Sequence, residues 1–413
     1  MRVRFEKSEA KGRVIAPPSK SIAHRLLIAC ALACGQSEVT GISDSEDMLA
    51  TLDCIKTLGI AVEKDGDVVR IDSYGANGNR ISEDTGLEKD KETNIFNCRE
   101  SGSTLRFFIP IASVFFEKST FEGSQRLLER GVGIYEKTLK EHGVSVSVEK
   151  NEIDVCGRLV SGAYTLDGNV SSQYVSGLMF ALPLLDGDSE IRVKEPVESR
   201  AYIDMTIAVL KEVGVDVVER ERNVFFVKGN QKYRSGKYCV EGDWSNAAML
   251  LALGEIGGNA SVCGLDENSV QGDKICKEIF QKLGEKNPVV DLANCPDLAP
   301  ICFVVAALKN GAKFTGTRRL KIKESDRAEA MAQELEKFGI DVEVYENDVM
   351  VHKNEIKTPC CEICGHNDHR IVMACSVLLS RTGGYINGAE AVKKSFPNFF
   401  EKLGELGVKY EIE

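Results

Sequence analysis

The hydrophobic and polar positions along the chain follow one pattern that recurs six times. A polar cluster opens an apolar run of helical spacing, a short alternating stretch follows, and an amphipathic stretch then ends in glycine before two more alternating stretches. The polar clusters lie at 19–21, 101–104, 171–173, 243–246, 297 and 367–369, and the glycines are Gly59, Gly143, Gly214, Gly284, Gly339 and Gly407. Two landmarks that recur together predict six related units.

One unit shows which elements the pattern predicts. Apolar residues between Ala328 and Phe338 recur at intervals of three and four, which is typical of a helix packed on one face. Gly339 ends this helix, residues 340–345 alternate as a half-buried strand, and a turn leads to a second strand at 349–351. The unit is therefore αβαββ or a permutation of it, and six units predict an α/β protein.

The polar cluster that opens each unit carries Ser, Thr, Asp or Asn, the residues that cap helix N-termini. Capping alone explains any single cluster, but cations lie beside nearly all of them. Lys20 lies within the first cluster, Arg25 follows it, and Arg106 follows the second cluster. Because the helix dipole disfavours cations at this end, their placement indicates bound anions such as phosphate or carboxylate.

Composition narrows the class of protein. The chain has 413 residues, 43% hydrophobic and 28% charged, which is typical of globular domains, and its net charge of -11 disfavours nucleic acid and acidic membranes as partners. It contains no run of 18 apolar residues and begins with a charged segment, so we expect neither a membrane span nor a secretory signal. The 14 cysteines lie mostly in apolar stretches, which favours free thiols in the cytoplasm. No dinucleotide-binding or phosphate-loop fingerprint follows a predicted strand.

The second half of the chain concentrates acidic and basic side chains. Lys323 and Arg327 are four residues apart, which would place them on one helical face, and Glu324 lies between them in sequence. Asp368-His369-Arg370 and Lys394-Ser395-Phe396-Pro397 add further cations.

Ten segments, in order, resemble the enolpyruvyl transferase family. They are Pro17 to Ser21, Gly102 with Arg106, Gln125-Arg126, Ser171 to Gln173, Ser199 to Asp204, Glu241 to Asp243, Pro296-Asp297, Lys323 to Arg327, Asp368 to Arg370, and Lys394 to Pro397. The resemblance implies a two-domain inside-out α/β barrel with six βαβαββ-type repeats, three per domain. It also implies that residues 1–19 plus 241–413 form domain I and residues 20–240 form domain II, with the helix starts facing the cleft between them.

The resemblance also implies a reaction in which the enolpyruvyl group of phosphoenolpyruvate passes to the 5-hydroxyl of shikimate 3-phosphate. It implies that shikimate 3-phosphate is bound by Lys20, Ser21, Arg25, Ser171, Ser172, Gln173, Ser199, Tyr202, Asp297 and Lys323. It implies that phosphoenolpyruvate is bound by Lys20, Gly102, Arg106, Arg126, Gln173, Arg327, Arg370 and Lys394.

The catalytic groups implied by the resemblance are Asp297 as the base and Glu324 as the acid, with Lys20, Lys394 and His369 assisting. This reaction has no redox step, so we expect no cofactor and no metal. We expect a monomer that glyphosate inhibits in competition with phosphoenolpyruvate. The chain departs from the usual family pattern around Gly102, where Glu100, Ser101, Ser103 and Phe107 stand.

Three other functions are compatible with parts of the sequence. UDP-N-acetylglucosamine enolpyruvyl transferase shares the fold and the reaction. Members of that family use a cysteine in a loop near the second repeat, and residues 119–131 of this chain contain no cysteine. Cys361-x-x-Cys364 with His366 and His369 invites a zinc site, although a second pair of cysteines at defined spacing is missing. A purely structural repeat scaffold predicts similar caps in each unit, whereas the caps here differ.

Overall fold

The computed structural model describes residues 1–73, 94–149 and 152–413, and these form two compact units. Unit 1 consists of Met1–Ser19 and Glu241–Glu413, and unit 2 consists of Lys20–Val240. Each unit has its own hydrophobic core. None of the helices within the described ranges has the length and apolar character that a membrane crossing requires.

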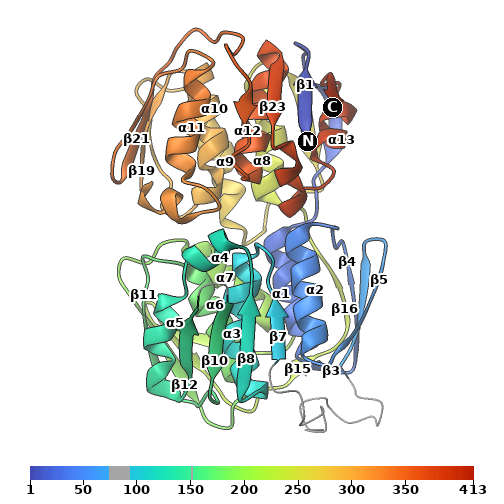
Figure 1. Ribbon diagram of the computed structural model, residues 1–413, viewed down its shortest axis with the longest axis vertical. Coiled ribbons are helices and arrows are strands. Elements are labelled where there is room, and N and C mark those ends of the chain that lie inside the picture. Colours follow the sequence, from blue (N-terminus) through green and yellow to red (C-terminus); the bar gives the residue numbers. More distant parts are fainter. Residues whose placement is uncertain (74–93, 150–151) are drawn as a thin grey trace. The chain divides into compact units, whose positions relative to one another are not determined.

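Unit 2 contains three four-stranded sheets and one two-stranded sheet among its described residues (Figure 1). Its helices are α1 (Lys20–Ala31), α2 (Glu46–Thr57), α3 (Gly102–Phe115), α4 (Gln125–Glu129), α5 (Gly133–Thr138), α6 (Ser172–Ala181) and α7 (Arg200–Glu212), with 3-10 helices η1 (Lys140–His142) and η2 (Leu182–Leu184). One sheet joins β16 (Lys237–Cys239), β4 (Gln36–Thr40), β6 (Val68–Asp72) and β5 (Ala61–Asp65). The second joins β7 (Asn94–Asn97), β8 (Lys118–Glu122), β10 (Glu152–Cys156) and β9 (Ser145–Val148), and the third joins β11 (Ala163–Asp167), β12 (Ser189–Lys194), β14 (Val224–Val227) and β13 (Val217–Glu221). The small sheet pairs β15 (Tyr233–Arg234) with β3 (Ala33–Cys34).

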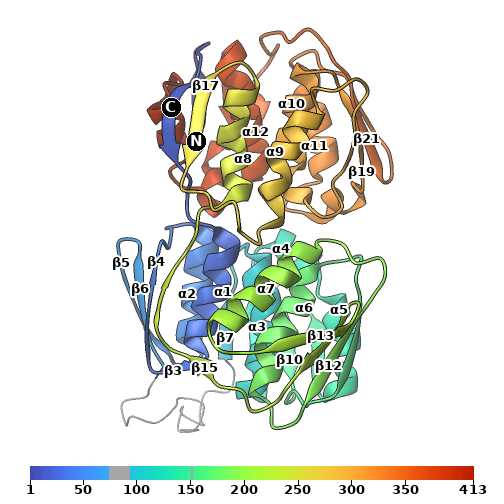
Figure 2. The same cartoon turned by 180° about the vertical axis from the view of Figure 1, so that it is seen from behind.

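Unit 1 contains two four-stranded sheets and one two-stranded sheet (Figure 2). Its helices are α8 (Trp244–Glu255), α9 (Cys276–Lys282), α10 (Ala299–Leu308), α11 (Arg327–Glu336), α12 (His369–Thr382) and α13 (Phe399–Glu405), with η3 (Gly272–Ile275), η4 (Pro296–Leu298), η5 (Arg318–Ile322) and η6 (Ala389–Lys394). One sheet joins β22 (Ile363–Cys364), β23 (Gly384–Asn387), β1 (Arg2–Phe5) and β24 (Tyr410–Ile412), and the other joins β18 (Val289–Asp291), β19 (Ala312–Thr315), β21 (Asp348–Val351) and β20 (Val342–Val344). The two-stranded sheet pairs β17 (Asn259–Cys263) with β2 (Lys11–Ile15).

All of these four-stranded sheets share one strand arrangement. The first two strands in each order are parallel, and the third and fourth are added antiparallel, as in β7-β8-β10-β9 and β18-β19-β21-β20. The second strand follows a buried helix in every case, so that β4, β8, β12, β19 and β23 follow α1, α3, α6, α10 and α12. The parallel pair β2 and β17 has the same relation to α8 but lacks the two antiparallel strands.

The helices that precede these strands are buried on nearly every side. Ile22 to Ala31 of α1, Ala299 to Ala307 of α10 and His369 to Ser380 of α12 are all buried. A helix that is apolar around its whole circumference belongs in the interior of a domain. The sheets therefore cover these helices, and only the helix ends can present polar groups to a ligand.

Candidate functional site

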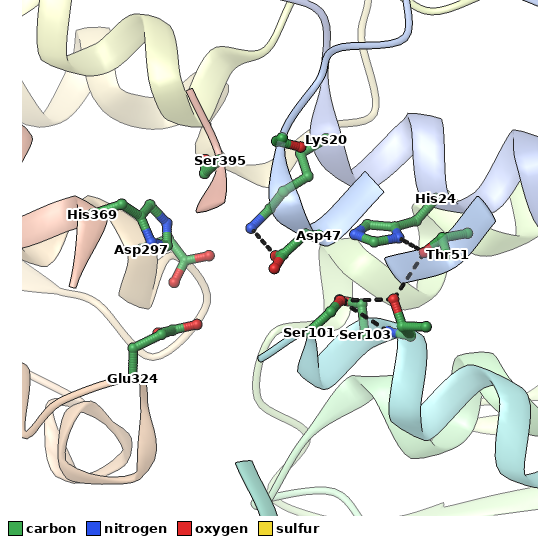
Figure 3. A network of polar contacts seen from close by, with 12 residues as sticks. Lys20, His24, Asp47, Thr51, Ser101, Ser103, Asp297, Glu324, His369 and Ser395 are labelled. Atoms are coloured by element: carbon green, nitrogen blue, oxygen red, sulfur yellow. Dashed lines mark hydrogen bonds and ion pairs between the residues drawn. The ribbon is translucent and has the colours of Figure 1, made fainter. Parts of the chain in front are cut away.

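The first turn of α1 presents Lys20, whose ammonium donates to the Asp47 carboxylate of α2 at 2.8 Å (Figure 3). Both side chains are largely shielded from solvent, with 16% and 14% of their area exposed. Partial burial strengthens an ion pair relative to a surface pair. Asp47 therefore fixes the position of Lys20.

Arg25 lies one turn further along α1 and is buried. Its Nε donates to Thr206 Oγ1 at 2.8 Å, Nη1 to the Ser21 carbonyl at 2.8 Å, and Nη2 to the Tyr202 carbonyl at 3.1 Å. Burial lowers the pKa of Arg25 to about 10. The guanidinium is thus held between α1 and α7.

The start of α3 combines a capped helix end with a glycine and an arginine. The Ser101 hydroxyl caps the helix by accepting from the Thr104 amide, and Gly102 is the first helical residue. Arg106, one turn on, donates through Nη1 to Gln173 Oε1 at 2.9 Å. A Cβ on Gly102 would lie 2.7 Å from Arg106 Nη1 and 3.1 Å from Arg130 Nη2. Two guanidinium groups therefore pack against the glycine.

The start of α6 adjoins this group through Gln173. Ser171 caps α6 by accepting from the Gln173 amide, and Ser172 is buried in the first turn. The Gln173 side-chain amide donates to Ser103 Oγ at 2.9 Å while its carbonyl accepts from Arg106. The starts of α3 and α6 are thereby joined.

Three other predicted residues of unit 2 lie on α4, on α7 or immediately before α7. Arg126 belongs to α4, and 41% of its side chain is exposed. Ser199 precedes α7 in a left-handed conformation (φ 57°) and is buried. Tyr202 is partly buried in the first turn of α7, and its carbonyl accepts from Arg25.

In unit 1, a buried guanidinium binds three carboxylates. Arg327 is 1% exposed and donates to Asp297 Oδ1 at 2.6 Å, Glu324 Oε2 at 2.7 Å and Asp368 Oδ2 at 2.9 Å. Figure 3 shows Asp297 and Glu324 side by side. Burial lowers the pKa of Arg327, but Asp368, Glu324 and Asp297 outweigh that effect and raise this pKa well above its ordinary value. The arrangement brings both predicted proton-transfer groups together.

The protonation of Asp297 follows from its neighbours. Burial alone would raise the Asp297 pKa, but the positive charges of Lys323, Arg327 and Arg370 outweigh it and hold this pKa well below its ordinary value. Lys323 Nζ donates to Asp297 at 3.2 Å. Burial in turn lowers the pKa of Lys323, and the attraction of Asp297 opposes that change. Asp297 is therefore ionised at neutral pH.

The predicted shared helical face of Lys323 and Arg327 is wrong. The 3-10 helix η5 ends at Ile322 and α11 begins at Arg327, with Asp326 as its cap, so Lys323 and Glu324 lie in the connection. An Asp at this position competes for the backbone amides and starts a helix rather than continuing one. The two cations nevertheless meet, because both donate to Asp297.

The start of α12 carries the last predicted residues. His369 is its first residue and is 3% exposed, and Asp368 caps the helix by accepting from the Arg370 amide. Arg370 is buried and donates to the Ser245 carbonyl at 2.9 Å. Lys394 donates to the Asn367 carbonyl at 2.6 Å, immediately before the helix.

Several polar residues that support these groups escaped the sequence prediction. Asp47 and Asp368 bind predicted cations directly, and the buried carboxylate of Asp273 interacts electrostatically with both Asp297 and Arg370. Asp368 belongs to a recognised motif and could have been included. Asp47 and Asp273 carry no such signal, because an acidic residue in the first turn of a helix is common.

The cysteine-rich segment before α12 is not arranged as a metal centre. His366 Nε2 bonds to Glu334 Oε1 at 2.8 Å, and the sulfur atoms of Cys360 and Cys361 are 3.9 Å apart. Within residues 1–73, 94–149 and 152–413, no group of three or more His, Cys, Asp or Glu side chains is placed to hold a metal ion.

Comparisons with known proteins cover nearly the whole chain. Residues 6–403 match the profile of the family described as EPSP synthase (3-phosphoshikimate 1-carboxyvinyltransferase). A 3-phosphoshikimate 1-carboxyvinyltransferase of Clostridium kluyveri is 38% identical over 98% of this chain and 97% of the relative, and one of Clostridium acetobutylicum is 39% identical over 96% and 95%. The solved EPSP synthase of Acinetobacter baumannii has the same fold, with a TM-score of 0.78, 24% identity, and coverage of 100% of this chain and 99% of that one.

Proposed function

This chain belongs to the EPSP synthase (3-phosphoshikimate 1-carboxyvinyltransferase) family, and from that membership we propose that it transfers the carboxyvinyl group of phosphoenolpyruvate to shikimate 3-phosphate. The acceptor is the 5-hydroxyl, and phosphate is released. The enzyme acts in the shikimate pathway, which supplies aromatic amino acid biosynthesis.

The observation that carries this function is the joint attachment of Asp297 and Glu324 to Arg327. Addition of an alcohol across the enol double bond requires one group to take the hydroxyl proton and another to protonate the methylene carbon. Two carboxylates held by one buried guanidinium supply such a pair in a fixed geometry. The low pKa of Asp297 keeps that carboxylate ionised, as a base must be.

The reaction then proceeds in two stages. The 5-hydroxyl oxygen bonds to C2 of phosphoenolpyruvate, its proton passes to Asp297, and Glu324 delivers a proton to C3. In the second stage a proton leaves C3 of the tetrahedral intermediate and returns to Glu324, which restores the methylene group. Phosphate leaves C2 at the same time and takes up the proton held by Asp297. His369 and Lys394 assist at the carbon, and Lys20 stabilises the phosphate charge.

Cationic groups offset the repulsion between the two anionic substrates. The phosphate of phosphoenolpyruvate is bound by Lys20 at the start of α1, by the Gly102 amide and Arg106 of α3, by Arg126 of α4 and by Gln173. Arg327, Arg370 and Lys394 serve the remainder of this substrate. Shikimate 3-phosphate is held by Ser21, Arg25, Ser171, Ser172, Gln173, Ser199, Tyr202 and Lys323, together with Lys20 and Asp297.

We further propose that each unit is a domain built from three repeats. The shared arrangement of the four-stranded sheets supports this proposal, because in each of them a buried helix precedes the second strand of the sheet. The pair β2 and β17 with α8 supplies the sixth repeat. This repeat lacks the antiparallel pair, in agreement with the short spacing of 54 residues between the clusters at 243 and 297. Two domains with three such repeats each would form the inside-out α/β barrel that the resemblance implies.

Phosphate release tests the function. We expect release from phosphoenolpyruvate with shikimate 3-phosphate and none with UDP-N-acetylglucosamine. Asp297→Asn and Glu324→Gln keep the side-chain shape and remove the carboxylate, so turnover should fall by about 10² to 10⁴ with small changes in substrate binding. Glu285→Gln alters an exposed carboxylate and serves as the control. Release with the nucleotide sugar, or near-normal turnover of both site variants, would overturn these assignments.

A further inference from the structure

A chain of hydrogen bonds links three helices of unit 2, close to Lys20 and Asp47 (Figure 3). His24 Nδ1 of α1 lies 2.7 Å from Thr51 Oγ1 of α2, which lies 2.8 Å from Thr104 Oγ1 of α3. Thr104 Oγ1 donates to Ser101 Oγ at 2.7 Å. All four residues are at most 1% exposed. The chain therefore links the helix of Lys20 to the cap of the helix that begins at Gly102.

The direction of the chain follows from counting hydrogens. A hydroxyl carries one hydrogen, and that of Thr104 is used toward Ser101. The bond between Thr51 and Thr104 must then be donated by Thr51. Since the only hydrogen of the Thr51 hydroxyl is spent there, His24 must donate to Thr51 from Nδ1. The imidazole is therefore the tautomer with its hydrogen on Nδ1.

The surroundings of His24 agree with this tautomer. Burial, together with the positive charges of Lys20 and Arg25, lowers the pKa of His24 well below its ordinary value, so the ring is neutral and carries one N–H. His24 Nε2 is buried and meets no hydrogen-bonding group among the residues that the structure describes. A hydrogen on Nε2 would be a buried donor without an acceptor there, which is rarer and costlier than a bare lone pair.

We propose that His24 is a positioning residue whose Nδ1–H drives a one-way chain through Thr51 and Thr104 to Ser101, and that this chain prepares the start of α3 for an anion. Every hydrogen in the chain points toward Ser101, so the dipoles of the chain add to the positive end of the α3 dipole beside Gly102. The chain also holds α1, α2 and α3 together, since His24 and Thr51 lie one turn after Lys20 and Asp47, and Thr104 lies two residues after Gly102.

This inference rests on the proposed function, since it takes the anion at Gly102 to be the phosphate of phosphoenolpyruvate. Among the described residues the Thr51 hydroxyl bonds to His24 and Thr104, neither of which is a proposed substrate-binding residue, so its substitution isolates the effect. Thr51→Val is nearly isosteric and removes the hydroxyl, whereas Thr51→Ser keeps it. Thr57→Val is the matched control, because it removes a hydroxyl at the other end of α2 whose partners in the described part of the chain are the Asp53 and Ile95 carbonyls.

Two measurements test the proposal. Nitrogen-15 NMR of histidine-labelled wild-type enzyme should show the His24 hydrogen on Nδ1, and this reading does not depend on activity. Steady-state kinetics should show that Thr51→Val raises the KM for phosphoenolpyruvate about tenfold while that for shikimate 3-phosphate changes less than about twofold. Thr51→Ser should restore the wild-type value and Thr57→Val should leave it unchanged.

The outcomes separate this proposal from the proposed function. A hydrogen on Nε2 in the wild type overturns the proposal, even in an active enzyme. An unchanged KM for phosphoenolpyruvate in Thr51→Val, or equal increases for both substrates, overturns it as well. If Thr51→Val does not fold, the position of the His24 hydrogen in the wild-type enzyme decides whether the proposal holds. Failure of the wild type to release phosphate would instead refute the proposed function, whatever the tautomer.

Discussion

At the scale of single residues, unit 1 concentrates buried charge around Arg327. Three carboxylates surround this guanidinium, and Lys323 and Arg370 add positive charge beside Asp297. Removing one partner from such a group leaves a buried charge unpaired, and water cannot reach that charge to screen it. The ionisation of each member is therefore set by the group rather than by the residue type.

Asp273 shows the opposite shift within the same unit. Its burial, reinforced by repulsion from Asp297, raises its pKa from the ordinary 3.8 to about 6. Between these values the folded protein holds a proton that the unfolded chain releases, so stability is greatest below pH 3.8 for this group and declines as pH rises to about 6. Above pH 6 the folded protein carries the full cost of a buried, repelled carboxylate.

Asp273→Asn should therefore stabilise the protein more at pH 7.5 than at pH 4.5. About one and a half pKa units of the shift lie above pH 4.5, so the difference between the two pH values is about 2 kcal/mol, as an order of magnitude. Denaturant unfolding at both pH values measures it, with the exposed Asp67→Asn as the charge-matched control. An equal effect of Asp273→Asn at both pH values would show that the Asp273 carboxylate is not perturbed.

The chemistry of these residues was only partly predictable from the sequence. Asp297, Glu324 and Arg327 stand in motifs, and the structure brings them together as a group. Asp273 and Asp47 act through burial and through neighbours that are distant in sequence, and no local spacing encodes either property. Side-chain networks of this kind become visible only when the helices are packed.

At the scale of elements, most helix starts were predictable and the connections were not. The predicted cap at Asp297 is wrong, because Asp297 lies in η4 and Leu298 stands at the cap position of α10, with no side-chain cap. The clusters at 101, 171, 243 and 368 cap helices through their own side chains, as local chemistry dictates. The helix and strands predicted at 328–351 match α11, β20 and β21 to within a few residues. The incomplete sheet of β2 and β17 was not foreseen, because a missing strand pair leaves no pattern except a shorter spacing.

The packing at the start of α3 predicts the effect of Gly102→Ala. The added methyl group must displace Arg106, whose Nη1 would be 2.7 Å away and which also donates to Gln173. Glyphosate is longer than phosphoenolpyruvate and carries a phosphonate and a carboxylate, so it should tolerate the lost space less well. We expect its inhibition constant to rise about ten- to a hundredfold, with a smaller change in the KM for phosphoenolpyruvate.

Inhibition measured at fixed shikimate 3-phosphate tests this expectation. Gly133→Ala is the matched control, because a Cβ at the start of α5 would meet no atom within 4 Å. Equal inhibition constants for the wild type and Gly102→Ala would show that Gly102 does not border the inhibitor.

At the scale of the whole molecule, the chain passes between its two units twice, at Ser19–Lys20 and at Val240–Glu241. The residues proposed for shikimate 3-phosphate are divided between the units, with Arg25 in one and Lys323 in the other. A ligand held by both sets must restrict the motion of the units, whereas cations without an anion repel.

Shikimate 3-phosphate should therefore reduce the radius of gyration of the enzyme. Small-angle scattering of the free and ligand-saturated protein measures this change, and shikimate without its phosphate serves as the control. Superimposable profiles with and without shikimate 3-phosphate would contradict the expected closure.

The two crossings are also joined to each other, and this has a consequence for how the chain can be rearranged. The Ser19 amide donates to the Glu241 carbonyl at 2.8 Å, the Asp243 amide donates to the Pro17 carbonyl, and Pro18 pairs with Gly242 in an antiparallel bridge. Both ends of the segment 20–240 therefore connect to unit 1 at one pair of hydrogen-bonded strands, and this segment is an insertion, or cassette, between the two strands of a hairpin. In a variant that lacks residues 20–240, a two-residue Asn-Gly turn should suffice to connect Ser19 to Glu241 and close the hairpin. The same junction is the natural place at which relatives could exchange their cassettes.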